Sequence, residues 1–172
     1  MEGTVAQWAL VLQGTEQTKR AAAAEKLAQC SLPLAPAMVA LVQAAGDRDD
    51  GIRMWAAEAL GTAGRPAASD ALRLAAFLTT APIGADGESA YWAAKVLGRL
   101  GPAAAPATSA LATALKESPY LAVREQAAAA LGRIGPAASA AGSVLREAAA
   151  GGPPRLVRLA ISALESIRGM AA

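Results

Sequence analysis

The sequence lacks histidine altogether, although it is 172 residues long. Histidine is the most frequent general base near neutral pH and the most frequent metal ligand, so its absence removes the usual components of base-assisted catalysis and of metal centres. Cys30 is the only cysteine, which excludes an intramolecular disulfide and a cysteine metal cluster. We interpret Cys30 as a small buried hydrophobe. We predict no catalytic residue, no cofactor and no metal.

Aromatic residues, an excess of charge and long apolar runs are also scarce. Aromatics make up 3% of a chain that is 54% hydrophobic, so the core must consist mainly of Ala, Leu, Val and Ile. The 16 basic and 14 acidic residues give a net charge of +2, too balanced to predict a polyanion partner. The apolar run from Trp8 to Leu12 is short and follows Glu2 instead of a basic segment. We therefore expect no signal peptide, no membrane span and a cytoplasmic location.

An internal repeat dominates what is present. The stretches "IRMWAAEALGTAGRPAA" (52–68), "YWAAKVLGRLGPAA" (91–104) and "VREQAAAALGRIGPAA" (123–138) align on a leucine followed by glycine, and two weaker copies flank them. The aligned leucines are Leu27, Leu60, Leu97, Leu131 and Leu164, with separations of 33, 37, 34 and 33 residues. A period near 34 residues is the size of one helix pair with its turns.

Each copy is predicted to form two helices. In the fourth copy, Val123, Ala127, Leu131 and Ile134 recur at helical spacing and form one apolar face. A Gly-Pro pair at 135–136 then ends this helix and starts the next. No segment alternates with a period of two, so no sheet is expected. Small side chains allow neighbouring helices to approach closely, which explains the many alanines.

The pattern hydrophobic-Arg-x-x-Ala-Ala-x-x-Leu-Gly-x-hydrophobic-Gly-Pro resembles the HEAT-repeat family, in particular the bacterial form similar to the repeats of phycobilin lyases. The resemblance covers about residues 15–168 and implies a right-handed all-α solenoid. HEAT repeats often carry a ladder of acidic residues and arginines, which implies pairing of Arg20 with Glu16 and of Arg53 with Asp49 or Asp50. Arg124 occupies a similar place. In the third copy, Ala90 occupies the position that the three arginines hold in their own copies, and we expect the ladder to be interrupted there.

We predict a single domain over residues 1–172, made of ten helices. An orphan helix at 4–13 is followed by four pairs and a final orphan helix at 154–168. The predicted pairs are 16–30 with 33–45, 50–63 with 66–80, 87–100 with 102–117, and 120–134 with 136–149. The connection at 79–88 is either a tolerated insertion or a binding loop.

Both end helices are apolar on more than one side. The first includes Trp8, Val11 and Leu12, and the last includes Leu159 and Ile161. Solenoid caps usually have a polar outer face. Either these side chains are buried against the adjacent pair, or the ends associate with another copy of the chain.

Other residues have structural and functional interpretations. The acidic turn at 47–50 is expected to cap the next helix. Trp55 and Trp92 occupy the same repeat position, where they either pack between repeats or form an aromatic patch for a partner with Tyr91. Arginines of first helices and turns are expected to link neighbouring repeats. These arginines are Arg20, Arg53, Arg99, Arg124 and Arg133.

The resemblance implies that the second helix of each pair lines the concave side. The stripe expected to be exposed there is mildly polar and includes Gln43. From it we predict the partner contacts Arg73, Ser109, Lys116, Ser143 and Arg146. Only three cations lie along this stripe, with Asp70 and Glu147 near them, so nucleic-acid binding is the weakest hypothesis.

The first hypothesis for function is a non-enzymatic scaffold that binds an unidentified protein or peptide through a preformed surface. The alternative, implied by the resemblance alone, is an accessory protein of the bilin-lyase type. A visible absorbance shift on mixing with bilin separates the two, and salt-dependent retention on immobilised DNA detects nucleic-acid binding.

Overall fold

A computed structural model describes residues 4–79 and 87–169, and these residues contain α-helices, short 3-10 turns and no β-strand. The α-helices are α1 (Val5–Leu12), α2 (Gln17–Gln29), α3 (Met38–Ala44), α4 (Asp50–Thr62), α5 (Ala71–Thr79), α6 (Glu88–Leu100), α7 (Thr108–Glu117), α8 (Leu121–Ile134), α9 (Gly142–Gly151) and α10 (Pro154–Ile167). The predicted connection at 79–88 falls mostly on residues 80–86, outside the described part of the chain.

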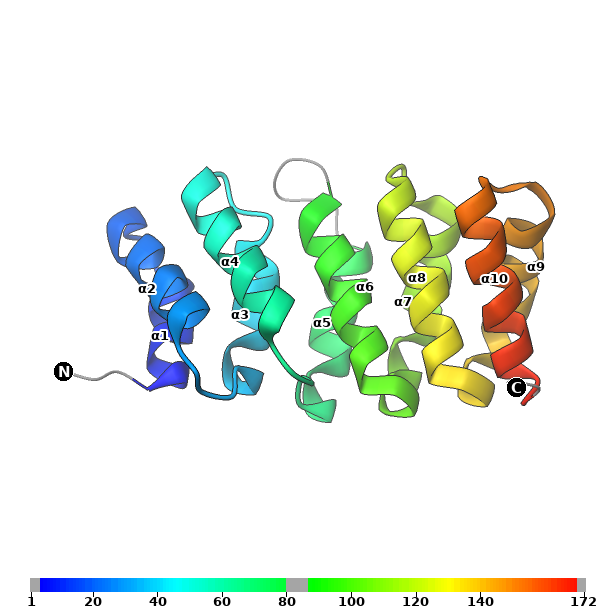
Figure 1. The fold of residues 1–172 in the computed structure, drawn as a ribbon, viewed down its shortest axis with the longest axis horizontal. Coiled ribbons are helices and arrows are strands. Elements are labelled where there is room, and N and C mark those ends of the chain that lie inside the picture. The colour runs from blue at the N-terminus through cyan, green and yellow to red at the C-terminus, as the bar shows by residue number, and fades with distance from the viewer. Residues whose placement is uncertain (1–3, 80–86, 170–172) are drawn as a thin grey trace.

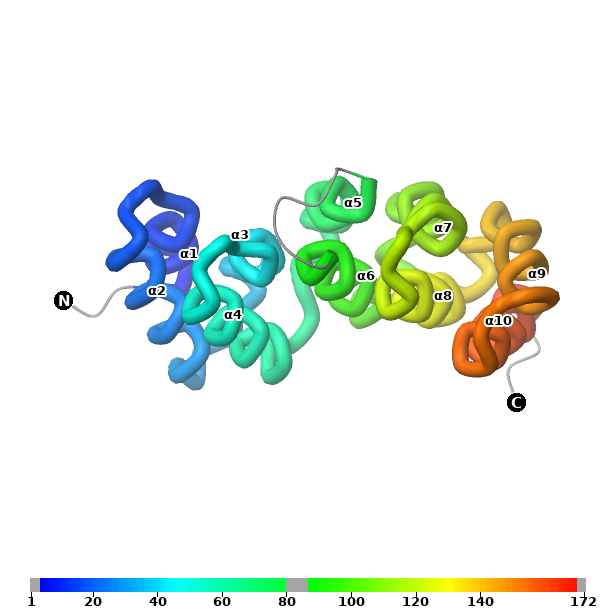
Figure 2. Tube along the Cα trace, turned by 90° about the horizontal axis from the view of Figure 1, so that it is seen from above, coloured from blue at the N-terminus to red at the C-terminus, as the bar shows by residue number. Residues whose placement is uncertain are grey.

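The helices stand side by side in one row with the two termini at opposite ends (Figure 1). Seen from above, they form two layers (Figure 2). One layer contains the even-numbered helices α2 to α10, which are the first helices of the repeats, and the other contains α1, α3, α5, α7 and α9. Between the layers, each odd-numbered helix packs against the even-numbered helix that follows it in the chain, and most helices also pack against neighbours in their own layer. The prediction of an all-α solenoid is confirmed.

The second helices begin later than predicted. A 3-10 turn precedes the α-helix in every pair: Ala35–Ala37 before α3, Ala68–Asp70 before α5, Gly101–Ala107 before α7 and Gly135–Ala141 before α9. Pro106 lies inside one of these turns, and a proline cannot donate the backbone hydrogen bond of a regular helix. The turn before α9 has a non-helical residue at Ala138.

The prediction of ten separate helices also needs correction. The turn at Gly101–Ala107 joins α6 to α7 without a break, and the turn at Gly135–Ala141 joins α8 to α9. Within the described ranges the chain therefore forms eight continuous helical stretches. Gly101 and Gly135 adopt φ values of 60° and 73°, which glycine tolerates, and the prolines that follow start the new turn. The sequence analysis correctly predicted where the chain turns from the first to the second helix of these two pairs. It did not predict that the two helices are joined by a helical turn.

The repeat leucines form the centre of the core. Leu27, Leu60, Leu97 and Leu131 have no exposed surface, whereas Leu164 of the last copy is half-buried. Alanines fill most of the space around them; Ala24, Ala56, Ala93 and Ala127 are also fully buried. Burial of an aliphatic side chain contributes about 2 kcal/mol. The core is thus aliphatic, as the composition predicted.

Glycines following the repeat leucines set how closely first helices approach. A Cβ at Gly98 would lie 3.4 Å from the Cα of Ala130 on α8, and a Cβ at Gly132 would lie 3.1 Å from the Cα of Ala163 on α10. Gly61 on α4, by contrast, has open space around its Cβ position. Helix α4 makes almost no contact with α6, which packs against α3 and α8 instead. The first-helix layer is therefore interrupted after α4, at the repeat with the 37-residue spacing.

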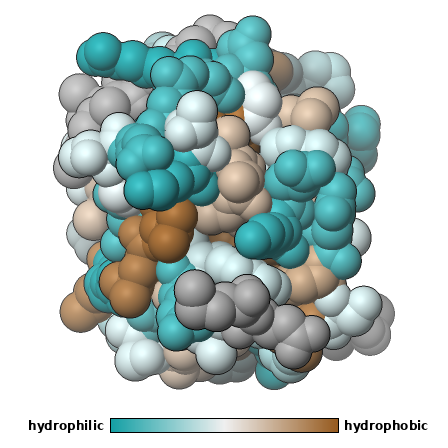
Figure 3. Space-filling view, turned by 90° about the vertical axis from the view of Figure 1, so that its left-hand side faces the viewer, coloured by the Kyte–Doolittle hydropathy of each residue, from teal (hydrophilic) through white to brown (hydrophobic). Residues whose placement is uncertain are grey.

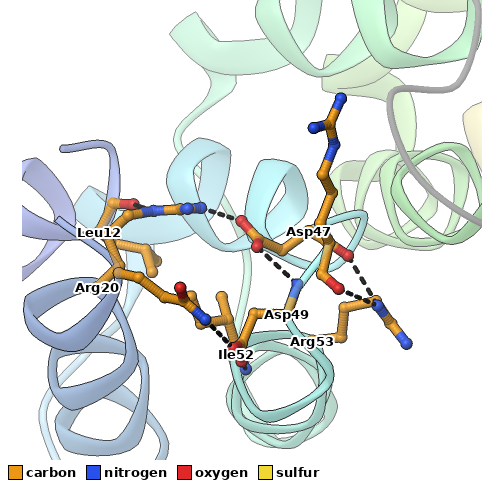
Figure 4. Close-up of polar contacts among 8 residues, drawn as sticks. Leu12, Arg20, Asp47, Asp49, Ile52 and Arg53 are labelled. Atoms are coloured by element: carbon orange, nitrogen blue, oxygen red, sulfur yellow. Dashed lines mark hydrogen bonds and ion pairs between the residues drawn. The ribbon is translucent and has the colours of Figure 1, made fainter. Parts of the chain in front are cut away.

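Arginine and aspartate side chains join the first two repeats (Figure 4). The Nε of Arg20 donates a 3.0 Å hydrogen bond to the carbonyl of Leu12, and its guanidinium forms an ion pair with Asp47. The other carboxylate oxygen of Asp47 accepts a 3.0 Å bond from the backbone N–H of Asp49. Asp49 in turn caps α4 by accepting a 2.9 Å bond from the N–H of Ile52. The capping prediction is confirmed.

The expected ladder differs in its pairings. Arg20 pairs with Asp47 and not with Glu16, which pairs with Lys19 instead. Of the two partners considered for Arg53, Asp50 is the ion-pair partner. The reason is that Asp47 lies in the turn before the next repeat, so it faces α2 from across the interface. Spacing within one helix cannot show such a contact.

Two further arginines that were expected to link repeats, Arg124 and Arg133, differ from each other. Arg124 donates from Nε to the carbonyl of Leu115 at 3.0 Å, as Arg20 does to Leu12. The equivalent position of α6 is Ala90, so that link is absent from the third repeat, as predicted. Arg133 was also expected to link repeats, but it forms no hydrogen bond or ion pair with the residues that the structure describes.

The end helices combine polar and apolar exposure. On α1, Leu10 is 71% exposed, and hydrophobic areas lie among hydrophilic side chains on the N-terminal end (Figure 3). On α10, Ile161 is 45% exposed between Arg158 and Glu165, which are also exposed. Glu165 occupies the repeat position held by glycine in α4, α6 and α8. A carboxylate there gives the last helix a more polar outer face than the sequence analysis expected.

Helices of the described residues are all too short or too polar to cross a membrane.

Candidate binding groove

A groove with a volume of about 860 Å³ runs along one edge of the solenoid. It follows the edge at which second helices end and the next first helices begin. We call it the edge groove. Its lining comes from residues 12–14 and Arg20, residues 40–48 of α3 and the following turn, residues 76–79 of α5, residues 87–90 of α6, and residues 113–120 of α7 and the next turn. The C-terminal ends of α1, α3, α5 and α7 thus contribute to one surface.

Apolar side chains form much of the lining. Leu12 is buried, and Phe77, Leu78 and Tyr120 are half-buried against the core. Gly87 holds one wall in place: its φ is 70°, and a Cβ there would lie 2.4 Å from Cδ2 of the Tyr120 ring. The ring of Tyr120 therefore packs directly on the backbone at the start of α6. Partly buried apolar and aromatic walls are typical of ligand pockets.

The charged residues of the groove fall into two groups. Arg20 and Asp47 are paired with each other and are mostly buried. Arg48, Glu88 and Glu117 are exposed and form no ion pair with other described residues. Among the residues that the structure describes, the rim thus offers one unpaired cation and two unpaired carboxylates around an apolar floor. Such a rim can orient a partner with side chains of both signs.

The groove has hydroxyl groups but no arrangement suited to nucleophilic catalysis among the described residues. The Oγ of Ser118 accepts a 3.3 Å bond from the backbone N–H of Tyr120, and the hydroxyl of Thr79 bonds a backbone carbonyl. Neither Ser89 nor Thr113 hydrogen-bonds a carboxylate or a lysine of the described ranges. An activated nucleophile needs such a base within reach.

The polar row predicted from the sequence lies outside this groove. All five predicted contacts are exposed on second helices: Arg73 on α5, Ser109 and Lys116 on α7, and Ser143 and Arg146 on α9. Arg73 forms an exposed 3.1 Å ion pair with Asp70. Only Gln43, which the sequence analysis placed on the same stripe, lines the groove. The five residues stay predicted contacts, and we call them the polar row.

The two equivalent tryptophans differ in burial. Trp92 is 7% exposed and packs edge-to-face on Tyr91, with ring centroids 5.5 Å apart. Trp55 is only half-buried. The Nζ of Lys95 lies 4.5 Å from the centre of the Trp92 ring. Packing is therefore the role of Trp92, and its burial speaks against the exposed aromatic patch considered from the sequence.

Cys30 was predicted to be buried, but it is only half-buried at the end of α2. Its Sγ lies 3.4 Å from the carbonyl oxygen of Leu27. No group of three or more Asp, Glu, Cys or His residues in the described ranges could hold a metal ion.

Comparison with known proteins gives one family match. The model for HEAT repeats matches residues 73–165, more than half of the chain. No curated protein matches the chain. The crystal structure of an engineered protein aligns with a TM-score of 0.62 at 22% identity, over 96% of this chain and 48% of that one, so the chain spans about half the length of that structure. A designed armadillo repeat protein aligns over 95% of this chain and 100% of its own, at 15% identity and a TM-score of 0.35.

Proposed function

Because the chain belongs to the HEAT-repeat family, we propose that it is a non-enzymatic scaffold that binds a protein or peptide, and that the edge groove is its binding surface. The observation that carries this proposal is the groove itself: about 860 Å³, with a partly apolar lining that includes the C-terminal ends of α1, α3, α5 and α7. Concave sites with an apolar floor and a few polar groups are the usual form of ligand pockets.

Packing of the groove walls supports preorganised binding. Tyr120 rests on Gly87, and the Arg20–Asp47 ion pair ties α2 to the turn before α4. A surface that is ordered before its partner arrives loses little conformational entropy on binding. The groove is therefore a better candidate than the polar row, whose long side chains Arg73, Lys116 and Arg146 are exposed and must be ordered by the partner.

The free charges at the rim indicate the kind of segment that fits. Glu88 and Glu117 favour basic side chains near one part of the groove, and Arg48 favours an acidic side chain elsewhere. The apolar residues Phe77 and Tyr120 favour at least one large apolar side chain between them. An extended peptide with one apolar anchor, basic residues on one side of it and an acidic residue elsewhere meets these requirements.

The test is selection of peptides from a random library on the purified chain, followed by affinity measurements with the best peptide. Two arginines in the groove, Gln43→Arg with Thr113→Arg, should weaken binding by at least about tenfold through steric and charge obstruction. The matched control, Ser109→Arg with Ser143→Arg, adds the same charge to the polar row and should change the affinity by less than about twofold.

Three outcomes contradict the proposal. Failure to select any peptide contradicts peptide binding. Loss of binding with the polar-row pair but not with the groove pair assigns the surface to the residues predicted from the sequence. A visible absorbance shift on mixing the chain with bilin, abolished by the groove pair, favours a role of the bilin-lyase type instead.

A further inference from the structure

A second, smaller depression lies on the outer face of the first-helix layer, with a volume of about 490 Å³. We call it the basic pocket. Its lining residues are Ala63, Gly64, Arg65, Lys95, Gly98, Arg99, Gln126 and Arg133. Four of these eight residues are cations and none is a carboxylate, although the whole chain is nearly neutral. It shares no lining residue with the edge groove.

One cation of the basic pocket is fixed by the fold. Arg99 donates from its two Nη atoms to the carbonyls of Ala63 at 2.7 Å and Leu60 at 2.8 Å, at the end of α4. These bonds hold a half-buried guanidinium between α4 and α6. Burial lowers the pKa of Arg99, and the positive charge of Arg133 lowers it further. The second cause means that the two guanidinium groups repel each other at this site.

Arg133 occupies the same repeat position as Arg99 but makes no equivalent link. Within the described residues it has no hydrogen bond or ion pair, and one of its Nη atoms would lie 3.1 Å from a Cβ at Gly98. The missing side chain of Gly98 therefore gives the guanidinium room above α6. Arg133 is exposed and free to meet a ligand.

The other two cations are also uncompensated. Lys95 contacts the rings of Tyr91 and Trp92, at 5.5 and 4.5 Å from their centres, and has no carboxylate partner in the described ranges. Arg65 lies exposed in the turn after α4 and likewise has no ion pair there. Four positive charges around one small depression repel one another unless an anion neutralises them.

We propose that the basic pocket binds a small anion that carries several adjacent phosphate groups. Such a ligand places several negative charges within a small volume, and guanidinium groups bind phosphate oxygens through paired hydrogen bonds. The amide of Gln126 adds a neutral donor to the lining. The site is independent of the edge groove and of any peptide bound there.

Charge outside the pocket favours a small ligand over a nucleic acid. A duplex follows a long basic stripe and releases many counterions. The neighbouring first helices instead carry exposed carboxylates, Glu58 on α4 and Glu165 on α10, and Arg155 is paired with Glu125 at 3.3 Å. The basic pocket is therefore flanked by carboxylates and does not continue as a long basic stripe.

The experiment measures binding of sodium tripolyphosphate to the full chain by titration calorimetry, with sodium sulfate at equal ionic strength as the reference anion. Saturable binding of one tripolyphosphate per chain, tighter than that of sulfate by at least about tenfold, is expected. Arg133→Gln should weaken tripolyphosphate binding by about tenfold. Arg158→Gln removes an exposed charge on α10 and serves as the matched control, with less than about a twofold effect.

The melting temperature separates binding from folding. Because Arg133 repels Arg99 and forms no hydrogen bond or ion pair with described residues, Arg133→Gln without ligand should melt at or above the melting temperature of the wild type. Absence of saturable binding overturns the proposal, as does equal weakening by Arg133→Gln and Arg158→Gln. Tighter binding of a short duplex DNA than of tripolyphosphate, lost in Arg133→Gln, also overturns it and assigns the pocket to nucleic acid.

Discussion

Arg99 on α6 donates a 2.8 Å hydrogen bond to the carbonyl of Leu60 on α4. The contact joins two first helices that otherwise hardly touch. Its second bond, to Ala63, binds a further carbonyl at the end of the same helix. One side chain thus bridges the interruption in the layer and also fixes a wall of the basic pocket.

Replacing this arginine should destabilise the fold. Arg99→Ala removes two hydrogen bonds from a charged donor and leaves the C-terminal carbonyls of α4 without these partners, so the free energy of unfolding should fall by about 2 kcal/mol. Urea denaturation measures this. Arg133 lies at the same repeat position but has no hydrogen-bond or ion-pair partner among the described residues, so Arg133→Ala should change the free energy of unfolding by less than about 0.5 kcal/mol. Equal losses in the two variants would contradict the assigned link.

The glycines of the repeat should respond in opposite directions to alanine. Gly61 has open space, so Gly61→Ala should raise the free energy of unfolding by about 0.5 kcal/mol through helix propensity. Gly132→Ala places a Cβ 3.1 Å from the Cα of Ala163, and should lower it by about 1 kcal/mol because two backbones must separate. Thermal and urea unfolding of both variants provide the measurement, and a gain for Gly132→Ala would show that α8 and α10 are not closely packed.

Asp49 should make stability depend on acid pH. The hydrogen bond from the Ile52 N–H, and then that from Gln17, lower the pKa of the Asp49 carboxyl below its ordinary 3.8. Its stabilising effect is therefore present above about pH 3.8 and is lost as the pH falls through the lower folded value. A titration extends roughly one pH unit to either side of the pKa. The difference in unfolding free energy between wild type and Asp49→Asn should therefore be constant from about pH 5 to about pH 7 and shrink below about pH 4. A difference that grows on acidification would contradict this cap.

Association through the ends is a separate proposal. Leu10 is 71% exposed on α1, and a solenoid end with an apolar patch can pack on a second copy. Light scattering at increasing concentration should show a rise in mean mass, which Leu10→Lys should reduce. Ala22→Lys, an exposed position on α2, is the control. A constant monomer mass at high concentration would remove the proposal.

The repeat pattern was sufficient to predict the helix pairs. Leu60, Leu97 and Leu131 mark one turn of each first helix, and the Gly-Pro pairs after the last two mark its end. These signals come from residues close together in the chain, so they can be recognised in a single sequence. The 3-10 turns were not predicted because alanine is compatible with both kinds of helix, and only the packing of the whole pair selects between them.

Contacts between repeats were harder to predict. The Arg20–Asp47 pair joins residues that are 27 positions apart, and it depends on how two repeats are placed relative to each other. The edge groove brings together residues 12–14 and 113–120, whose residue types give no local signal of binding. The Gly-Arg pairs at 98–99 and 132–133 could have indicated the basic pocket, because the same two residues recur at one repeat position.

The most direct test of the account is hydrogen–deuterium exchange of the chain with and without its best selected peptide. We predict that protection on binding is concentrated in the segments that line the edge groove, 40–48, 76–79 and 113–120. Protection confined to the segments around Ser109, Ser143 and Arg146, with none in these three, would contradict the claim that the groove is the binding surface.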